Sequence, residues 1–322
     1  MFTIIIQGDS VSNRFDRYNS LNKYLQNTFG EKVYKISLDL GLTCPNRDGK
    51  LDTRGCIFCH NGSSHFAESG KSIAEQIENA QKRVANKTKA KKFIAYFQSY
   101  TNTYAPTEFL EKVFTEAINH PDIAAISVAT RPDCLPTETL DLLERLNHIK
   151  PVWVELGLQT VNPKTVEYIR RGYENSVYFN AVKELKKRNI TVITHIIIGL
   201  PNDEKSDILN TLKFAVDAGT DGVKLQLLHI LLGTDLYEDY KRGQVTPLTL
   251  EEYMDILFSC IEHLPKNIVV HRITGDAPKK YLAAPLWSAD KKTVLNTINR
   301  EMEKRNIIQG RDQYELGIFN AR

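Results

Sequence analysis

The chain has 322 residues, of which 42% are hydrophobic and 25% are charged, and its formal net charge at pH 7 is +3. This composition is ordinary for a soluble globular protein, the length allows one large domain or one domain with an extension, and the small net charge neither requires nor excludes a nucleic-acid partner. A run of about 18 apolar residues is absent, so we expect no transmembrane helix.

The N-terminal residues lack the basic region and the small-residue cleavage site of a signal peptide, so we expect a cytoplasmic protein. Residues 14–24 mix cations with aromatic side chains. That mixture suits contact with nucleic acid, and it equally suits a helix that packs on the rest of the protein with its cations in water. Two further basic clusters, 87–92 and 183–188, are either solvated helix surfaces or phosphate contacts.

From residue 33 onward, strand-sized apolar segments alternate with amphipathic helical segments. The apolar runs are nearly continuous, which is typical of parallel strands buried on both faces. The predicted strands are 33–38, 93–97, 124–129, 152–156, 192–198 and 222–227, followed in the tail by 267–273. The predicted helices are 72–86, 107–119, 137–147, a short one from 162, 177–188, 204–218, 249–264 and 291–305.

A strand followed by a helix, repeated six times, predicts an α/β fold in the form of a partial (β/α)6 TIM-like barrel with N- and C-terminal extensions. We expect an N-terminal extension over 1–30, the core barrel over 31–240, and a C-terminal extension over 241–322 that completes or covers it. Six units fall short of a closed barrel and would leave a lateral cleft for a large substrate. A flat doubly wound sheet is the alternative, although no Gly-x-Gly-x-x-Gly follows a strand.

Three of the five cysteines, Cys44, Cys56 and Cys59, lie in an irregular polar loop after the first predicted strand. This is the end of the strand at which β/α enzymes place their chemistry. Three thiolates can hold three irons of a [4Fe–4S] cube and leave the fourth iron open as a reaction site. We interpret the other two, Cys134 and Cys260, as structural, although Cys134 lies near the mouth of a strand.

Zinc is the alternative occupant of this loop. Cys-x-x-Cys is common in zinc sites, and His60 or His65 could supply the fourth ligand. The position of the loop on the catalytic rim favours a cluster, because a structural zinc seldom needs that place. Phe58, directly before the third cysteine, could pack on a ligand beside the cluster.

The cysteine pattern and the six β/α units together resemble the radical S-adenosylmethionine (SAM) enzymes, whose common motif is Cys-x3-Cys-x-aromatic-Cys. This chain has eleven residues in the first gap, and in this it resembles the branch that includes the catalytic subunit of Elongator. Segments 44–49 and 96–105 resemble the bacterial YtqA/YhcC-type family of that branch. The resemblance covers about residues 30–240.

The resemblance implies a barrel of the radical SAM type that holds a [4Fe–4S] cluster and SAM. It implies an enzyme that reductively cleaves SAM to a 5′-deoxyadenosyl radical, with an electron donor such as flavodoxin or ferredoxin and no membrane partner. The implied substrate is tRNA, at the side chain of a wobble uridine. A small-molecule or protein substrate, a non-catalytic zinc-bound RNA-binding module, and an iron–sulfur electron carrier remain alternatives.

The resemblance also implies site residues at the ends of the strands. It places Phe58, Gln98, Thr101, Asn102, Glu155, Gln159, Arg171, Gly199 and Leu228 against SAM.

Within that set, Gln98, Thr101 and Asn102 at the end of the second strand are assigned to the amino group of SAM. The alternative is a turn whose polar side chains form hydrogen bonds within the turn itself. Glu155 is assigned to a ribose diol or to the ammonium group of SAM. The alternative is an ion pair between Glu155 and an arginine.

The ribose is assigned to Gln159. The SAM carboxylate is assigned to Arg171, with Arg170 as a second candidate. A close backbone approach to adenine is assigned to Gly199 and Pro201. Contacts with the edge of adenine are assigned to Leu227, Leu228 and His229 at the end of the sixth strand.

Two features are assigned to the substrate side. Arg131 and Asp133, at the mouth of the third strand, are the candidate catalytic residues, and a local Arg–Asp pair is the alternative. The polar segment 271–276 is either a salt-bridge set or a substrate contact. His195, inside the fifth strand, is interpreted as a core histidine.

Overall fold

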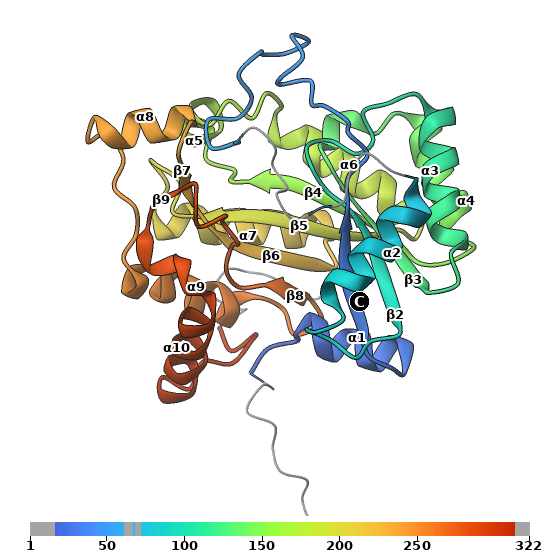
Figure 1. Ribbon diagram of the computed structural model, residues 1–322. Helices are drawn as coiled ribbons and strands as arrows, with labels where there is room; N and C mark the ends of the chain where they lie inside the picture. The colour runs from blue at the N-terminus through green and yellow to red at the C-terminus, as the bar shows by residue number, and fades with distance from the viewer. Residues whose placement is uncertain (1–16, 61–66, 68–71, 313–322) are drawn as a thin grey trace, which may run out of the picture.

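The computed structural model describes residues 17–60, 67 and 72–312. Seven parallel strands form one curled sheet in the order β1-β2-β3-β4-β5-β6-β8 (Figure 1). The strands are β1 Val33–Leu38, β2 Lys92–Phe97, β3 Ile123–Thr130, β4 Val152–Gln159, β5 Thr191–Ile198, β6 Gly222–Leu227 and β8 Val269–Arg272. The sheet is therefore a half-barrel with a concave inner face, which we call the lumen.

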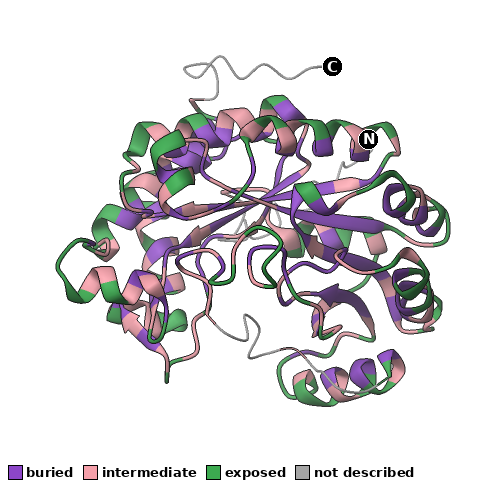
Figure 2. Ribbon diagram, turned by 90° about the horizontal axis from the view of Figure 1, so that it is seen from above, coloured by how far each residue is buried: buried purple, intermediate pink, exposed green. Residues whose placement is uncertain are grey.

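Helices cover the convex outer face of the sheet, and their outward faces are exposed (Figure 2). They are α2 Ile73–Val84, α3 Thr107–Asn119, α4 Thr137–Asn147, α5 Pro163–Tyr168, α6 Asn175–Lys187, α7 Lys205–Ala218 and α9 Leu250–His263. Between them and the sheet lies the main apolar core, with fully buried Phe97, Phe114, Leu143 and Leu185 among its members. No helix in the described part of the chain is both long and apolar enough to cross a membrane.

The predicted partial barrel is confirmed, with one strand more than the six β/α units supply. The tail segment predicted as a strand at 267–273 forms β8 and pairs in parallel with β6. A short antiparallel pair, β7 Ile230–Leu231 with β9 Leu282–Ala284, and the helices α8 Asp235–Lys241 and α10 Lys291–Lys304 complete this end of the chain. The alternative of a flat doubly wound sheet is wrong, because the sheet curls around the lumen.

The helix α1, Leu21–Phe29, closes the base of the lumen. Its N-terminus is capped by Ser20 and its C-terminus ends at Gly30 in the left-handed conformation. Leu25 points from α1 into an apolar floor. The other buried members of that floor are Val33, Ile94, Ala125, Trp153 and Ile193. From residue 17 onward, the N-terminal segment thus packs on the barrel, while residues 14–16 lie outside the described residues.

The segment that leads into α1 is tied to the far end of the chain. The backbone N–H of Val270 donates to the carbonyl oxygen of Asn19 at 2.8 Å, and the N–H of Asn19 donates to Gln309 Oε1 at 2.7 Å. The Gln309 amide nitrogen donates in turn to the carbonyl oxygens of Pro265 and Ile268. Residues near 19 and near 309 therefore meet at the base of the half-barrel and cover the edge of β8.

Replacing Leu25 with alanine is expected to lower the free energy of unfolding by about 2–4 kcal/mol, because it leaves a cavity in the apolar floor. Leu25 is 4% exposed, and Leu51, which is 51% exposed, offers a matched control. Urea unfolding of the two alanine variants compares them. Equal effects would show that α1 does not close the barrel in solution.

Candidate active site

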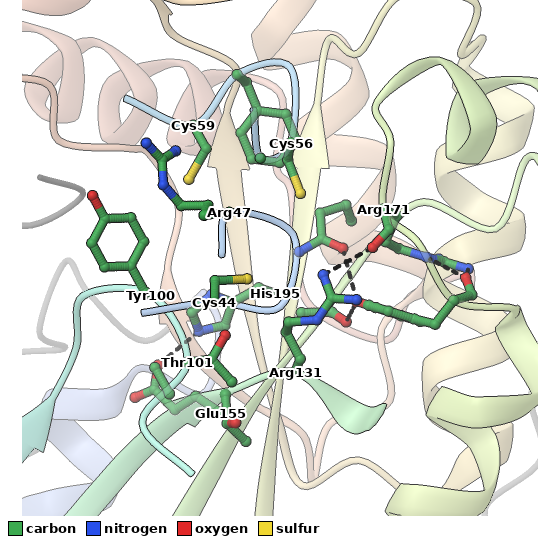
Figure 3. A pocket seen from close by; sticks show the side chains of 17 residues that line it. Cys44, Arg47, Cys56, Cys59, Tyr100, Thr101, Arg131, Glu155, Arg171 and His195 are labelled. Atoms are coloured by element: carbon green, nitrogen blue, oxygen red, sulfur yellow. Dashed lines mark hydrogen bonds and ion pairs between the residues drawn. The ribbon is translucent and has the colours of Figure 1, made fainter. Parts of the chain in front are cut away.

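The cysteine loop begins directly after β1 and lies at the C-terminal edge of the sheet. Its backbone folds on itself, with the N–H groups of Arg47 and Cys59 donating to the carbonyl oxygens of Cys44 and Cys56, both at 2.8 Å. It is also tied to the loop after α5, because Ile57 N–H donates to Ile169 O at 3.2 Å. Figure 3 shows the sulfur atoms of the three cysteines around one common space.

The common space is a pocket that several of the predicted residues share. The residues that line it include Cys44, Cys56, Phe58, Cys59, Thr101, Arg131, Glu155, Gln159, Arg171 and His195. Arg47, Tyr100, Gly157 and Tyr173 line it as well and were not predicted. The pocket does not include Gln98, Asn102, Asp133, Gly199 or Leu228 among its lining residues.

Three thiols line the pocket, and this donor set fits an iron–sulfur cube with one open corner. Among the residues that the structure describes, no three His, Cys, Asp or Glu side chains lie close enough to hold a single metal ion. Zinc binds each sulfur at about 2.3 Å and so draws its ligands close together, whereas a cube is held at three separate corners. The predicted fourth zinc ligand His60 packs against the tilted ring of Tyr281, at 4.5 Å between ring centroids. The other candidate, His65, lies outside the described residues.

Burial raises the pKa of the Cys56 and Cys59 thiols, that of Cys59 to about 12. The nearby guanidinium groups of Arg131 and Arg47 oppose this shift without reversing it. Both thiols therefore stay protonated in the protein alone, and a bound metal centre must supply the positive charge that makes them thiolates. Loading the site is expected to release protons.

The loop after β2 presents polar atoms that the protein leaves unused. Ser99 and Tyr100 have positive φ angles of 94° and 55°. This turn brings Thr101 to the pocket wall, where its buried hydroxyl has no hydrogen-bond partner among the described residues. The Asn102 amide nitrogen donates to Ala129 O at 2.9 Å and holds the loop against β3. Thr101 thus faces the pocket, while Asn102 supports it.

The end of β4 is bent where it meets the pocket. Its pairing with β5 shifts register between Gly157 and Gln159, and Gln159 has a φ of 62°. The Tyr173 hydroxyl donates to Gly157 O at 2.5 Å and lies 3.4 Å from Gln159 Oε1. This bend turns Gln159 into the pocket, in agreement with its predicted side of the sheet.

Gly199 and Leu228 lie beside each other at the ends of β5 and β6. The N–H of Leu228 donates to Ile198 O at 2.9 Å, and a side chain at Gly199 would meet Leu248. Gly199 also has a φ of 95°, which favours glycine. These residues flank the pocket without lining it.

The carboxylate role predicted for Arg171 does not agree with its contacts. Its side chain is fully buried, and its nitrogens donate to the carbonyl oxygens of Leu158, Thr160 and Tyr173 and to Asn175 Oδ1. These bonds use all five N–H donors of a guanidinium. Arg171 therefore holds the β4–α5 connection together and has no donor left for a ligand carboxylate.

Glu155 also has different partners from those predicted. Its Oε1 accepts from Lys35 Nζ and Ser127 Oγ, both at 2.7 Å, and its Oε2 is bonded by His195 at 2.7 Å and by Lys224. Neither a ribose nor an arginine is needed to balance this carboxylate. Although burial alone would raise it, the ammonium groups of Lys224 and Lys35 hold the pKa of Glu155 well below its usual range.

The local Arg–Asp pair is what the structure shows for the two candidate catalytic residues. Arg131 donates to both carboxylate oxygens of Asp133, at 2.9 and 2.8 Å, and to Arg171 O at 2.9 Å. The guanidinium also lies 4.8 Å from the ring centre of Tyr173 and lines the pocket. Cys134, which follows Asp133, is buried, and burial raises the pKa of its thiol to about 12. It is not among the pocket residues.

Two lysines of the lumen were missed although the sequence carried a signal for them. Lys35 and Lys224 stand alone as charges inside the strands β1 and β6, as Glu155 does in β4. The three charges meet because alternate residues of neighbouring strands point into the lumen. Single charged residues in different buried strands therefore indicate one cluster of charges inside the barrel.

His229, which follows β6, is expected to make the protein less stable in acid. Burial lowers its pKa to about 4 from 6.5. Between these two values the unfolded chain binds a proton that the folded chain does not, so the free energy of unfolding falls as the pH falls through this window. Replacing His229 with glutamine is expected to reduce the loss of stability between pH 7 and pH 5 by about 2 kcal/mol.

Urea unfolding of both proteins at the two pH values measures this difference. Asp203 acts in the opposite sense, because burial raises its pKa to about 6, but it is present in both proteins and cancels. An unchanged pH dependence in the His229→Gln variant would show that His229 is solvated in the folded state.

A curled sheet of parallel strands with a three-cysteine loop at its C-terminal edge defines the radical SAM class of proteins. The chain belongs to this superfamily: the profile of the Radical SAM superfamily matches residues 53–215, and that of the Radical_SAM C-terminal domain matches residues 220–304. The first match includes Cys56 and Cys59 and begins after Cys44. Cys44 is therefore placed by the structure and not by the profile.

Known proteins resemble the chain over different lengths. The protein YtqA of Bacillus subtilis, described as uncharacterized, is 41% identical over 302 residues, which are 93% of this chain and 94% of YtqA. The tRNA uridine(34) acetyltransferase of Methanocaldococcus jannaschii is 28% identical over 187 residues, 57% of this chain and 33% of that protein. The solved structure of Methanocaldococcus infernus Elp3 lacking residues 1–46 has a TM-score of 0.65 at 18% identity and covers 89% of this chain and 68% of its own. The predicted YtqA-type relationship is confirmed.

Proposed function

We propose that this protein is a radical SAM enzyme that holds a [4Fe–4S] cluster through Cys44, Cys56 and Cys59. The observation that carries the proposal is the convergence of three thiols on one pocket at the C-terminal edge of the half-barrel. When bound, the cluster and SAM together supply a 5′-deoxyadenosyl radical after transfer of one electron from a donor such as flavodoxin or ferredoxin.

The residues of the chain then bind and orient SAM and exclude water. The unpartnered Thr101 hydroxyl is available to the amino group of SAM, and Gln159 to its ribose. Phe58 offers an apolar surface beside the cysteines. Gly199 and Leu228, at the ends of β5 and β6, would approach adenine. Arg131 is buried and bonded to Asp133 and Arg171, so it would act on a ligand through its charge, and Arg47 is the more exposed arginine that lines the pocket.

The proposed substrate is tRNA, at the side chain of a wobble uridine. Support comes from the Methanocaldococcus jannaschii relative, a tRNA uridine(34) acetyltransferase, of which this chain spans about a third. The basic clusters 87–92 and 183–188 do not add support. They precede β2 and β5 and therefore lie at the N-terminal edge of the sheet, away from the pocket. Ion pairs to Asp141 and Glu184 also neutralise Arg188.

The test is an anaerobic reconstitution with iron and sulfide, followed by reduction with dithionite and addition of SAM. We expect a brown protein that forms 5′-deoxyadenosine. A colourless protein that binds zinc would support the RNA-binding module instead, and a brown protein that leaves SAM intact would indicate an electron carrier. Mass spectrometry of tRNA nucleosides from a deletion strain tests the substrate.

A further inference from the structure

Below the cysteines, the lumen contains a ring of polar side chains to which every strand of the sheet contributes one residue. We call it the polar layer, and it consists of Lys35, Tyr96, Ser127, Glu155, His195, Lys224 and His271. The apolar floor capped by α1 lies beneath it, since Lys35 Nζ stands 5.4 Å from the ring centre of Trp153 and His271 packs edge-on against the same ring. Glu155 and His195 of the layer also line the cysteine pocket (Figure 3).

The charges of the polar layer do not balance. Two ammonium groups, those of Lys35 and Lys224, share the single carboxylate of Glu155. His195, which contacts the same carboxylate, does not change this count. Burial lowers the pKa of His195 to about 4, so its ring is neutral at pH 7. Arg272, next to His271, is paired with Asp276 at 3.2 Å and does not need Glu155. Burial also lowers the pKa of Lys224 to about 7, so Lys224 is only partly protonated at pH 7. The layer thus carries a partial positive charge, which reaches one when Lys224 is fully protonated.

The layer meets the pocket at Glu155 and His195, which line it, while Lys35 and Lys224 do not. The side chains of Lys35 and His195 are 17% and 18% exposed, although they lie inside the half-barrel. Glu155 is the one hydrogen-bond partner of the Lys35 ammonium among the described residues. An ammonium has three N–H donors, so Lys35 can bind a further acceptor. Its aromatic neighbours Tyr96 and Trp153 hold it in place by their ring faces.

A layer that served only to stabilise the fold would be expected to match its charges, because an uncompensated buried charge is costly. It would also be closed. This one keeps a partly exposed ammonium, that of Lys35, with one hydrogen-bond partner among the described residues, and the further partner that such a group takes is an anion. An excess of at most one positive charge suits a carboxylate, which is a monoanion, better than a phosphate monoester, which carries close to two charges at neutral pH.

We propose that the polar layer binds a carboxylate group of the substrate, with Lys35 as its ligand and buried Lys224 as a second positive charge behind it, and that it thereby selects substrates whose reacting side chain ends in an acid. This inference rests on the proposed function, since it assigns the substrate class of the same pocket. It gives Glu155 the role of a positioning residue that holds both ammonium groups on the floor side of the bound acid.

The test uses the full-length, cluster-loaded protein with SAM under anaerobic conditions. Three stem-loop RNAs serve as probes and differ in one group at C5 of a loop uridine: carboxymethyl, its neutral isostere carbamoylmethyl, or the cationic aminomethyl. Competition binding is followed by fluorescence anisotropy. We expect the carboxymethyl RNA to bind roughly tenfold or more tighter than the carbamoylmethyl RNA, as a charge-assisted hydrogen bond would give. The corresponding free nucleosides show whether the acid is recognised on RNA or also on a small molecule.

Variants assign the preference to the layer. Replacing Lys35 with methionine, which keeps the length of the side chain, is expected to bring the ratio of the two affinities close to one, and Lys35→Arg is expected to keep part of it. Lys213→Met is the matched control, because Lys213 pairs with Asp217 on the outer helix α7; it should keep the full preference. Lys224→Met provides a second test if the Lys35 variants do not fold.

The outcomes separate this inference from the proposed function. Equal binding of the carboxymethyl and carbamoylmethyl RNAs by the wild-type protein, or tighter binding of the aminomethyl RNA, would overturn the inference. So would an unchanged preference in both lysine variants. Formation of 5′-deoxyadenosine in the same preparations reports on the radical SAM activity independently. If 5′-deoxyadenosine forms but the RNAs bind equally well, the proposed radical SAM function stands and the inferred carboxylate recognition is wrong.

Discussion

Replacing Cys44 with alanine is expected to abolish the brown colour of the reconstituted protein and its formation of 5′-deoxyadenosine. Loss of an outer-shell partner of a metal ligand already costs roughly 10–100-fold in affinity or activity, and loss of a ligand should cost more. Cys44 is the informative position of the three, because the superfamily profile begins at residue 53 and only the fold brings Cys44 to the other two. Visible absorption and iron content measure the result.

Cys260 provides the matched control for this experiment. It is fully buried in α9, on the outer face of the sheet, and takes no part in the pocket. Cys260→Ala should keep the colour and lose only the small amount of stability that a removed sulfur atom costs. Normal iron content in the Cys44→Ala variant would show that another residue holds the third corner of the cluster.

Replacing Arg171 with leucine is expected to lower the free energy of unfolding by about 3–5 kcal/mol. Several buried carbonyl oxygens accept from the same guanidinium, and all of them would lose their donor in this variant. The carbonyl oxygens of Leu158, Thr160 and Tyr173 would remain without their guanidinium partner. Lysine should rescue only part of the loss, since an ammonium cannot reproduce the planar fork of five donors. Chemical denaturation at neutral pH measures the effect.

Arg145 offers a control of the same residue type. It forms an exposed ion pair with Glu111 at 2.9 Å, and its replacement by leucine should cost about 0–1 kcal/mol. The two roles of Arg171 predict different results. If Arg171→Leu were as stable as the wild-type protein and only bound SAM more weakly, the carboxylate role expected from the resemblance would be restored.

The sequence predicts the architecture well, because the signals involved are local. Continuous apolar runs mark buried parallel strands. A Ser or Thr followed three residues later by Glu is the pattern of a capping box, and Ser72 with Glu75 and Thr249 with Glu252 match it at the starts of α2 and α9. Both boxes are formed by the side chains that the pattern names. The joining of the tail strand to β6 could not be derived in this way, since the pairing of β6 with β8 depends on how far the sheet curls.

The site is predicted less completely, because contacts across the lumen have no local signature. The sequence shows that Glu155 needs a partner, but the partners come from β1 and β6, 120 and 69 residues away along the chain. The reverse error occurs at Arg171. The resemblance assigned Arg171 to a ligand carboxylate, whereas the bend of the chain after β4 brings backbone acceptors around it that no pattern of residue types reveals.

The tie between Asn19 and Gln309 has a consequence for how the protein is made. A ribosome releases the chain from its first residue onward, yet the bond that seals the base of the sheet joins positions 290 residues apart. Until the last of these residues has emerged, α1 lacks one of the contacts that hold it in place, and the edge of β8 is uncovered. The nascent half-barrel should therefore stay open at its base until residue 309 has emerged, and should depend on chaperones more than its final shape suggests.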